Sequence, residues 1–190
     1  MAVVLERVMT DGRTHLFDGV VSAIGKGLAD SLPWLDHVFG RAERLVKDVS
    51  GIRKYTPNWY VGKDEYIQLL PDQGLGNFCF FVMDEPEDVA WAVGERSQLS
   101  VGFSLIVWLD MRTVEDDDVR DTERVKEQML HVLNGGIWLR NGSYLIDEIY
   151  NRAENIYSGF TLEEVQNQFL MSPFCGFRFH GTMRINNACI

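Results

Sequence analysis

Two short stretches of the sequence are rich in carboxylates, the side chains that bind divalent cations or repel nucleic acid. The first stretch holds Asp84, Glu85, Glu87 and Asp88. The second covers residues 110–118, where one arginine, Arg112, accompanies the acids Asp110, Glu115, Asp116, Asp117 and Asp118. Because carboxylate oxygens are preferred ligands of Mg²⁺, a metal-dependent nuclease is one chemistry that these residue types permit.

A nuclease of the restriction type needs further residues at fixed places. Asp72 follows Pro71 just before a predicted strand, which resembles the start of such a motif. The Glu-x-Lys that belongs on the following strand is missing, because residues 78–83 hold neither a carboxylate nor a lysine. We therefore interpret both acidic stretches as solvated loop tips, and we keep an Mg²⁺-dependent nuclease as an alternative.

The other common catalytic patterns are incomplete. Residues 25–27 and 74–76 are each a lone G-x-G, without the third glycine or the Lys-Ser/Thr of a phosphate-binding loop. Cys175, His180 and Cys189 are residue types that bind soft metals, but an alternating strand places Cys175 and His180 on opposite faces. The sequence therefore predicts no catalytic, cofactor-binding or metal-binding residue, and no enzyme.

Residue types suited to protein contacts are more evident. The chain has five Trp, eleven Phe and six Tyr, and Trp108 lies on the partly apolar second face of a predicted strand. Trp108 is therefore a candidate contact with a partner, unless small satellite cores beneath loops bury such rings. Arg178 and Arg184 lie on the polar face of the last predicted strand, which makes that face basic.

The composition is typical of a globular chain, with 46% hydrophobic and 24% charged residues among 190. A net charge of −10 argues against a surface that binds nucleic acid by neutralising phosphates. No apolar stretch approaches the roughly 18 residues of a membrane span, so we expect neither a membrane protein nor a secreted one. Three cysteines without C-x-x-C spacing favour buried thiols in a reducing compartment.

Hydrophobic periodicity predicts two helices, over residues 16–28 and 33–46, followed by a sheet. Strands are predicted over residues 55–66, 66–70, 78–83, 101–110 and 175–186, and helices over 121–133 and 161–170. Residues 144–157 fit either period, and we favour a strand. This order predicts one α+β domain over residues 1–190, with a helical part at 1–50 and, at 51–190, a mostly antiparallel sheet flanked by helices.

The order of elements and several short segments also carry a resemblance to a known group of proteins. The segments are Tyr66-Ile-Gln-Leu-Leu-Pro-Asp72, Leu75-Gly-Asn-Phe-Cys-Phe-Phe81, Leu105-Ile-Val-Trp-Leu109, the predicted helix 123–133 and Pro173-Phe-Cys-Gly-Phe-Arg178. Together they resemble the tail-completion, tail-terminator and neck ring proteins of tailed bacteriophages, and most of all those of phages of gut Bacteroidetes, including crAss-like phages. The likeness covers residues 32–189.

The resemblance implies a tail-terminator-like α+β fold and a structural protein of the virion, located in the neck or tail and in the host cytoplasm during assembly. Such proteins form closed homo-oligomeric rings of six or twelve copies between the portal and the tail. The implied partners are further copies of this chain, and portal, adaptor or tail proteins, with transient contact to passing DNA. The family implies no cofactor, no membrane contact and no catalytic residue.

A closed ring needs two different patches on each subunit, because its contact is heterologous. We expect the acidic stretches and the basic strand face of Arg178 and Arg184 to supply such patches. We also expect residues 84–88 or 110–118 to face the channel or a neighbouring ring, where negative charge would keep DNA from adhering. A small monomeric protein-binding adaptor is the remaining alternative.

Overall fold

The fold is seen in a computed structural model that describes residues 8–9, 16–71, 73–92, 96–114, 121–135, 137, 139 and 142–186. The strands are β1 (Val8–Met9), β2 (His37–Arg41), β3 (Glu43–Val49), β4 (Ile52–Gly62), β5 (Glu65–Gln68), β6 (Phe78–Met83), β7 (Asp88–Ala92), β8 (Arg96–Asp110), β9 (Gly142–Tyr150) and β10 (Phe174–Asn186). The helices are α1 (Leu16–Ser31), the 3-10 turn η2 (Gln73–Leu75), α2 (Met111–Val114), α3 (Thr122–Asn134), α4 (Ala153–Ile156) and α5 (Glu164–Gln168).

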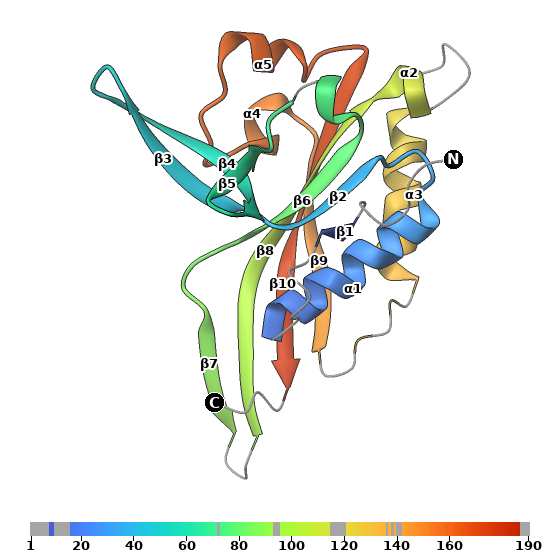
Figure 1. The fold of residues 1–190 in the computed structure, drawn as a ribbon. Coiled ribbons are helices and arrows are strands. Elements are labelled where there is room, and N and C mark those ends of the chain that lie inside the picture. The colour runs from blue at the N-terminus through green and yellow to red at the C-terminus, as the bar shows by residue number, and fades with distance from the viewer. Residues whose placement is uncertain are drawn as a thin grey trace.

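Within the described chain, seven strands form one sheet in the order β1-β2-β6-β8-β10-β9, with β7 paired to the first part of β8. The pairs β1–β2 and β2–β6 are parallel, and the other pairs of this sheet are antiparallel. Strands β3, β4 and β5 form a second, antiparallel sheet. The predicted α+β fold with a mostly antiparallel sheet is confirmed (Figure 1).

Helices α1 and α3 cover one face of the large sheet (Figure 1). The buried residues of α1 recur at helical spacing and include Phe17, Val20, Ile24 and Leu28. Helix α3 begins after Asp121, whose carboxylate accepts a hydrogen bond from the backbone N–H of Arg124 at 2.9 Å. The helices predicted over residues 16–28 and 121–133 are therefore confirmed. Among the described residues, no helix is long and apolar enough to cross a membrane.

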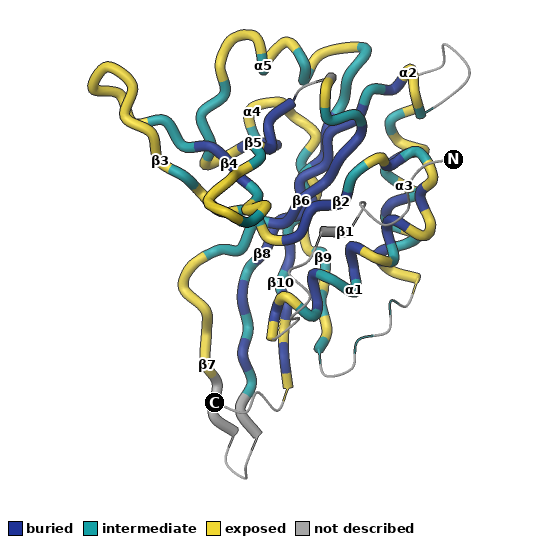
Figure 2. Tube along the Cα trace, viewed as in Figure 1, coloured by how far each residue is buried: buried dark blue, intermediate teal, exposed yellow. Residues whose placement is uncertain are grey.

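Strand β8 separates two hydrophobic cores. Its odd-numbered residues face the helices, while Ile106 and Trp108 point into a second core on the opposite face. The second core is closed by β4, β5 and the segment that carries α4 and α5. The middle strands are accordingly the most buried part of the chain (Figure 2), and all of residues 78–81 are 0% exposed. This double coverage explains why residues 78–83 are apolar at every position.

The helix predicted over residues 33–46 is wrong, since this segment forms β2 and β3. Strand β2 passes between the two cores, so the adjacent residues Val38 and Phe39 point to opposite faces and are each 1% exposed. Because both faces of β2 are buried, its apolar residues do not alternate with polar ones. Together with those of β3 they fall at spacings of three and four, which is the pattern of a helix. The helical part predicted for residues 1–50 is therefore restricted, within the described chain, to α1.

The later elements agree with the sequence more closely. The ambiguous segment begins as the favoured strand, β9, and continues into α4. Strand β10 shows the predicted alternation of buried and polar positions. The capping box of α5 is formed by Glu163 and Gln166. Thr161 lies outside the helix and bonds through its backbone and its hydroxyl to the backbone of Tyr55 in β4.

Candidate functional site

The acidic segment 84–88 connects β6 to β7, and three of its four acids are solvated as predicted: Glu85, Glu87 and Asp88. Asp84 instead folds back onto the sheet, and its backbone N–H donates to the carbonyl of Gly102 at 2.8 Å. A Cβ at position 102 would approach the Asp84 carboxylate to 2.7 Å. The glycine therefore leaves room for this carboxylate to lie flat on the sheet.

Asp84 meets the basic face of β10 there. Its carboxylate lies 3.7 Å from Nδ1 of His180, and the same nitrogen lies 3.2 Å from the Ser104 hydroxyl. Arg178 donates through Nε to the Ser104 hydroxyl at 3.0 Å and through Nη1 to the carbonyl of Ser158 at 2.8 Å. The structure thus joins one predicted acidic residue and one predicted basic residue in a single polar cluster.

Ser104, His180 and Asp84 are the residue types of a hydrolytic triad, but their arrangement differs from one. In a triad, serine and carboxylate bind different ring nitrogens, whereas both groups face Nδ1 here. Ser104 is 0% exposed, and its hydroxyl accepts a hydrogen bond from Arg178. Burial lowers the pKa of Arg178, and the charge of Asp84 opposes that shift. The cluster therefore fixes the acidic segment to the sheet.

Asp110, at the end of β8, is not a free acid. Its carboxylate accepts from Nη2 of Arg112 at 2.6 Å and from Nε at 2.9 Å, and its side chain is only 15% exposed. These hydrogen bonds hold the pKa of Asp110 below its ordinary value. A paired acid contributes little to a negative surface. Residues 115–118, with Glu115, Asp116, Asp117 and Asp118, lie outside the described residues, so the charge predicted there stays a prediction.

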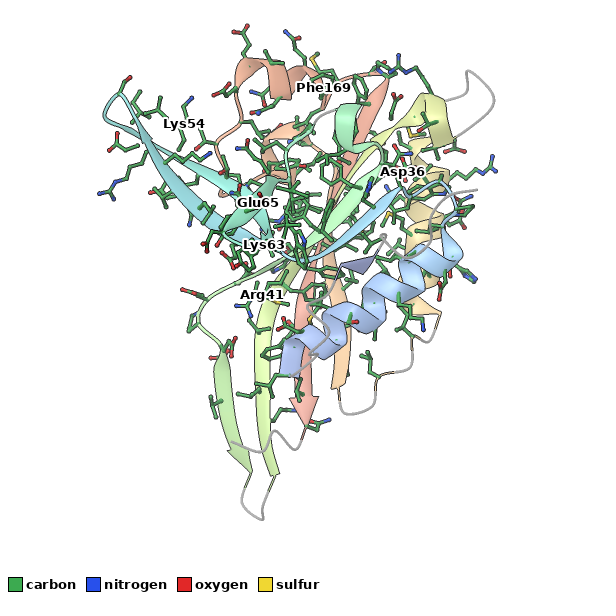
Figure 3. All side chains as sticks on the ribbon, in the orientation of Figure 1. Asp36, Arg41, Lys54, Lys63, Glu65 and Phe169 are labelled. Atoms are coloured by element: carbon green, nitrogen blue, oxygen red, sulfur yellow. The ribbon has the colours of Figure 1, made fainter. Side chains whose placement is uncertain are left out.

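Trp108 was predicted as a candidate contact with a partner, and that prediction is wrong. Its side chain is 0% exposed, and Nε1 donates to the carbonyl of Phe169 at 2.6 Å. The rings of Phe169 and Phe174 pack on it, with centroids 6.3 and 5.3 Å away. Phe169 lies just after α5, which folds over this face of the sheet (Figure 3). The satellite-core alternative is the correct one.

Arg184 is exposed on the polar face of β10, as predicted, and Cys175 packs against the core on the opposite face. Cys175 and His180 therefore point apart, and Cys189 lies outside the described residues. Among the residues that the structure describes, no group of three His, Cys, Asp or Glu is placed to hold a metal ion. Burial raises the pKa of the Cys79 thiol, which makes it unreactive.

A broad groove of about 740 Å³ lies between α1 and α3. Trp34 crosses it and donates through Nε1 to the side chain of Gln128 at 3.2 Å. The ionisable side chains that line it are Glu127 and His131, both on α3. This lining offers no convergent set of polar groups, so we do not place a ligand there.

An exposed hairpin is formed by β3 and the first part of β4, and we call residues 43–56 the arm. Ser50 and Gly51 both have positive φ, which is typical of a tight two-residue hairpin turn. Val46, Val49 and Ile52 are 54%, 45% and 64% exposed. The arm extends away from the large sheet, and Lys54 lies along it (Figures 1 and 3).

The root of the arm is held by the segment before α5. Lys54 forms an ion pair with Glu163 at 2.8 Å, which keeps the pKa of Glu163 below its ordinary value. Arg44 lies over the ring of Tyr55, 4.1 Å from its centroid. The arm was not predicted, because a helix was expected over residues 33–46, where its first strand lies. The Ser-Gly pair between two β-branched residues, Val49 and Ile52, was the available signal.

Strand β9 forms one end of the large sheet and presents a second exposed surface. Leu145 and Ile149 are 64% and 37% exposed. The strand pairs with β10 and has an irregularity opposite His180 and Gly181. A Cβ at position 181 would come within 1.9 Å of the Leu145 carbonyl, so only glycine allows the two strands to approach this closely.

No protein-family model matches the chain, and no curated protein matches it.

Proposed function

We propose that this chain is a virion structural protein of a tailed phage. In this proposal it forms a ring in the neck or tail connector, where it completes the tail or joins it to the head and DNA passes through. The observation that carries the proposal is the arm, a two-stranded ribbon that exposes apolar side chains away from either core. The resemblance to tail-completion and neck ring proteins leads us to assign this surface to contacts between subunits of the ring.

An exposed arm of this kind is unfavourable for a protein that stays monomeric. An isolated two-stranded hairpin is marginally stable in water, and an exposed edge strand invites pairing with other chains. Six of the seven residues of β3 are exposed, and its outer edge has no partner strand in the described structure. Contact with another subunit would bury the apolar tip and supply the missing hydrogen bonds, so we expect the arm to serve assembly.

The ring should be observable with the purified protein. We expect light scattering to give the mass of six or twelve copies, and electron microscopy of the same fraction to show closed rings. Val49→Ser together with Ile52→Ser should reduce the assembled fraction, because both side chains are exposed and contribute little to the monomer. Val165→Ser, at a 60% exposed position on α5, is the matched control. A monomer at every accessible concentration would favour the adaptor, and a closed two-fold dimer would contradict a ring.

The solvated acids of the 84–88 segment supply a second test. If they face the channel, Glu85→Ser with Glu87→Ser should increase the DNA retained by assembled rings, because two charges that repel phosphates are lost. The control, Asp30→Ser with Glu127→Ser, makes the same charge change on the helical face. Retention is measured by gel shift at several salt concentrations. Equal retention by both variants, with normal stacking of rings, would exclude a channel role for this segment.

A further inference from the structure

We infer that the arm of one subunit pairs with the open edge of β9 in the next copy of this chain, so that β3 extends the neighbour's large sheet. This inference rests on the proposed ring, since it names the two surfaces that would close it. Three independent features of the two strands support it: open backbone edges, matching apolar residues and opposite charge.

Both strands are edges with unused backbone groups. In the described chain, β3 pairs only with β4, and β9 pairs only with β10. They are seven and nine residues long, which is enough for a regular ladder. An extended segment that adds to an exposed sheet edge gains main-chain hydrogen bonds for affinity, while alternate side chains give specificity.

The exposed apolar residues of the two strands fall where such a ladder needs them. Val46 lies in the middle of β3, and Leu145 lies in the regular part of β9 before the irregularity. An antiparallel register that places Val46 beside Leu145 also places Arg44 beside Asp147, at the irregularity of β9, and Glu43 beside Glu148 at the end of the ladder. This register buries the two most exposed aliphatic side chains of these strands against each other.

The charges of the two surfaces are opposite. The arm carries four basic side chains, Arg44, Lys47, Arg53 and Lys54, and two acids, Glu43 and Asp48. Strand β9 carries two acids, Asp147 and Glu148, and no basic residue. Within the arm, Asp48 accepts a hydrogen bond from the backbone of Gly51 at 2.9 Å, and Lys54 is already paired with Glu163. Two copies of the arm would repel each other, and so would two copies of β9, whereas arm and edge attract.

The positions of the two surfaces make the contact head-to-tail. The arm follows β2 directly, and β2 and β9 are separated in the large sheet by β6, β8 and β10. Four strand spacings amount to about 19 Å, so the strand that leads into the arm is well separated from the β9 edge. A contact between two different surfaces repeats from subunit to subunit, and it forms a ring when the rotation closes.

Disulfide cross-linking tests the contact directly. Val46→Cys is made in one preparation and Leu145→Cys in a second that carries a size tag, and the mixture is oxidised. We expect the mixed dimer to form several-fold faster than in the control, where Val46→Cys is mixed with Val165→Cys on α5. Equal rates would overturn the inference. The substituted side chains are exposed, so the variants should fold, and thermal unfolding of each checks this.

A charge exchange separates this inference from the proposed ring. Arg44→Glu should reduce assembly, and adding Asp147→Arg in the same chain should restore it, because the register places these two side chains beside each other. If wild-type rings form and cross-linking is unselective, the inference fails while the ring stands. If cross-linking is selective but only open chains form, the contact is correct and the closed ring is not.

Discussion

Replacing Trp108 with alanine is expected to lower the free energy of unfolding by about 3–5 kcal/mol, the range for deleting a large buried aromatic side chain. The indole is 0% exposed and packs against Phe78, Phe169 and Phe174 in the second core. Its loss would leave a cavity and would also leave the carbonyl of Phe169 without its donor. Chemical denaturation monitored by circular dichroism measures the change.

Two further variants make this result specific. Trp108→Phe keeps an aromatic ring but loses the Nε1–H donor. It should lower the free energy of unfolding less than Trp108→Ala does, but by more than the loss of one hydrogen bond, which is about 1 kcal/mol. Leu145→Ala removes an apolar side chain that is 64% exposed, so it should change the free energy of unfolding of the monomer by less than about 0.5 kcal/mol. If Trp108→Ala lowered the free energy of unfolding as little as Leu145→Ala, the Trp108 side chain would not be part of the core.

Asn77→Leu is expected to lower the free energy of unfolding by about 3 kcal/mol. The substitution leaves buried polar groups without hydrogen-bond partners, and each such group costs about 1–3 kcal/mol. Asn77 is 1% exposed and joins three segments. Its Nδ2 donates to the carbonyl of Trp34 and to the hydroxyl of Thr113, both at 2.8 Å, and its Oδ1 accepts from the backbone of Asp110 at 2.8 Å. Leucine keeps the branch at Cγ but is larger than asparagine, so the loss combines the missing hydrogen bonds with overpacking.

The matched control is Asn151→Leu, at an exposed position after β9, which should be nearly neutral. Urea denaturation of both variants gives the comparison. The backbone of Asn77 also binds Asp36, through its N–H to the carboxylate and its carbonyl to the Asp36 N–H. These bonds survive the substitution, so the variant should still fold. A neutral result would show that water replaces the lost side-chain contacts.

The elements predicted correctly are those whose pattern is local. Strands β8 and β10 alternate over many residues, and the buried positions of α1 and α3 recur every three or four residues. Strand β2 gave the wrong pattern because both of its faces are buried, which removes alternation. The arm was missed with it, since a helix predicted through residue 46 left no room for the first strand of a hairpin.

The candidate site depended more on contacts distant in sequence. Alternation alone placed His180 on the polar face of β10, but nothing local indicated that Asp84, far away in the sequence, would fold back over Gly102 to meet it. Trp108 was misjudged for the same reason, because its cover comes from residues 156–174. The exposure of β9 follows only from its place at the end of the sheet.

The burial of β8 on both faces has a consequence for how the protein comes apart. This strand contributes Phe103, Leu105 and Val107 to one core, and Ile106 and Trp108 to the other. Neither core can separate from the sheet without exposing the strand that the other core needs. Loss of either layer therefore removes the support of its counterpart, and the two layers should melt as one cooperative unit. A chain built in this way should unfold as one unit, and its exposed arm can deform without transmitting disorder to the centre.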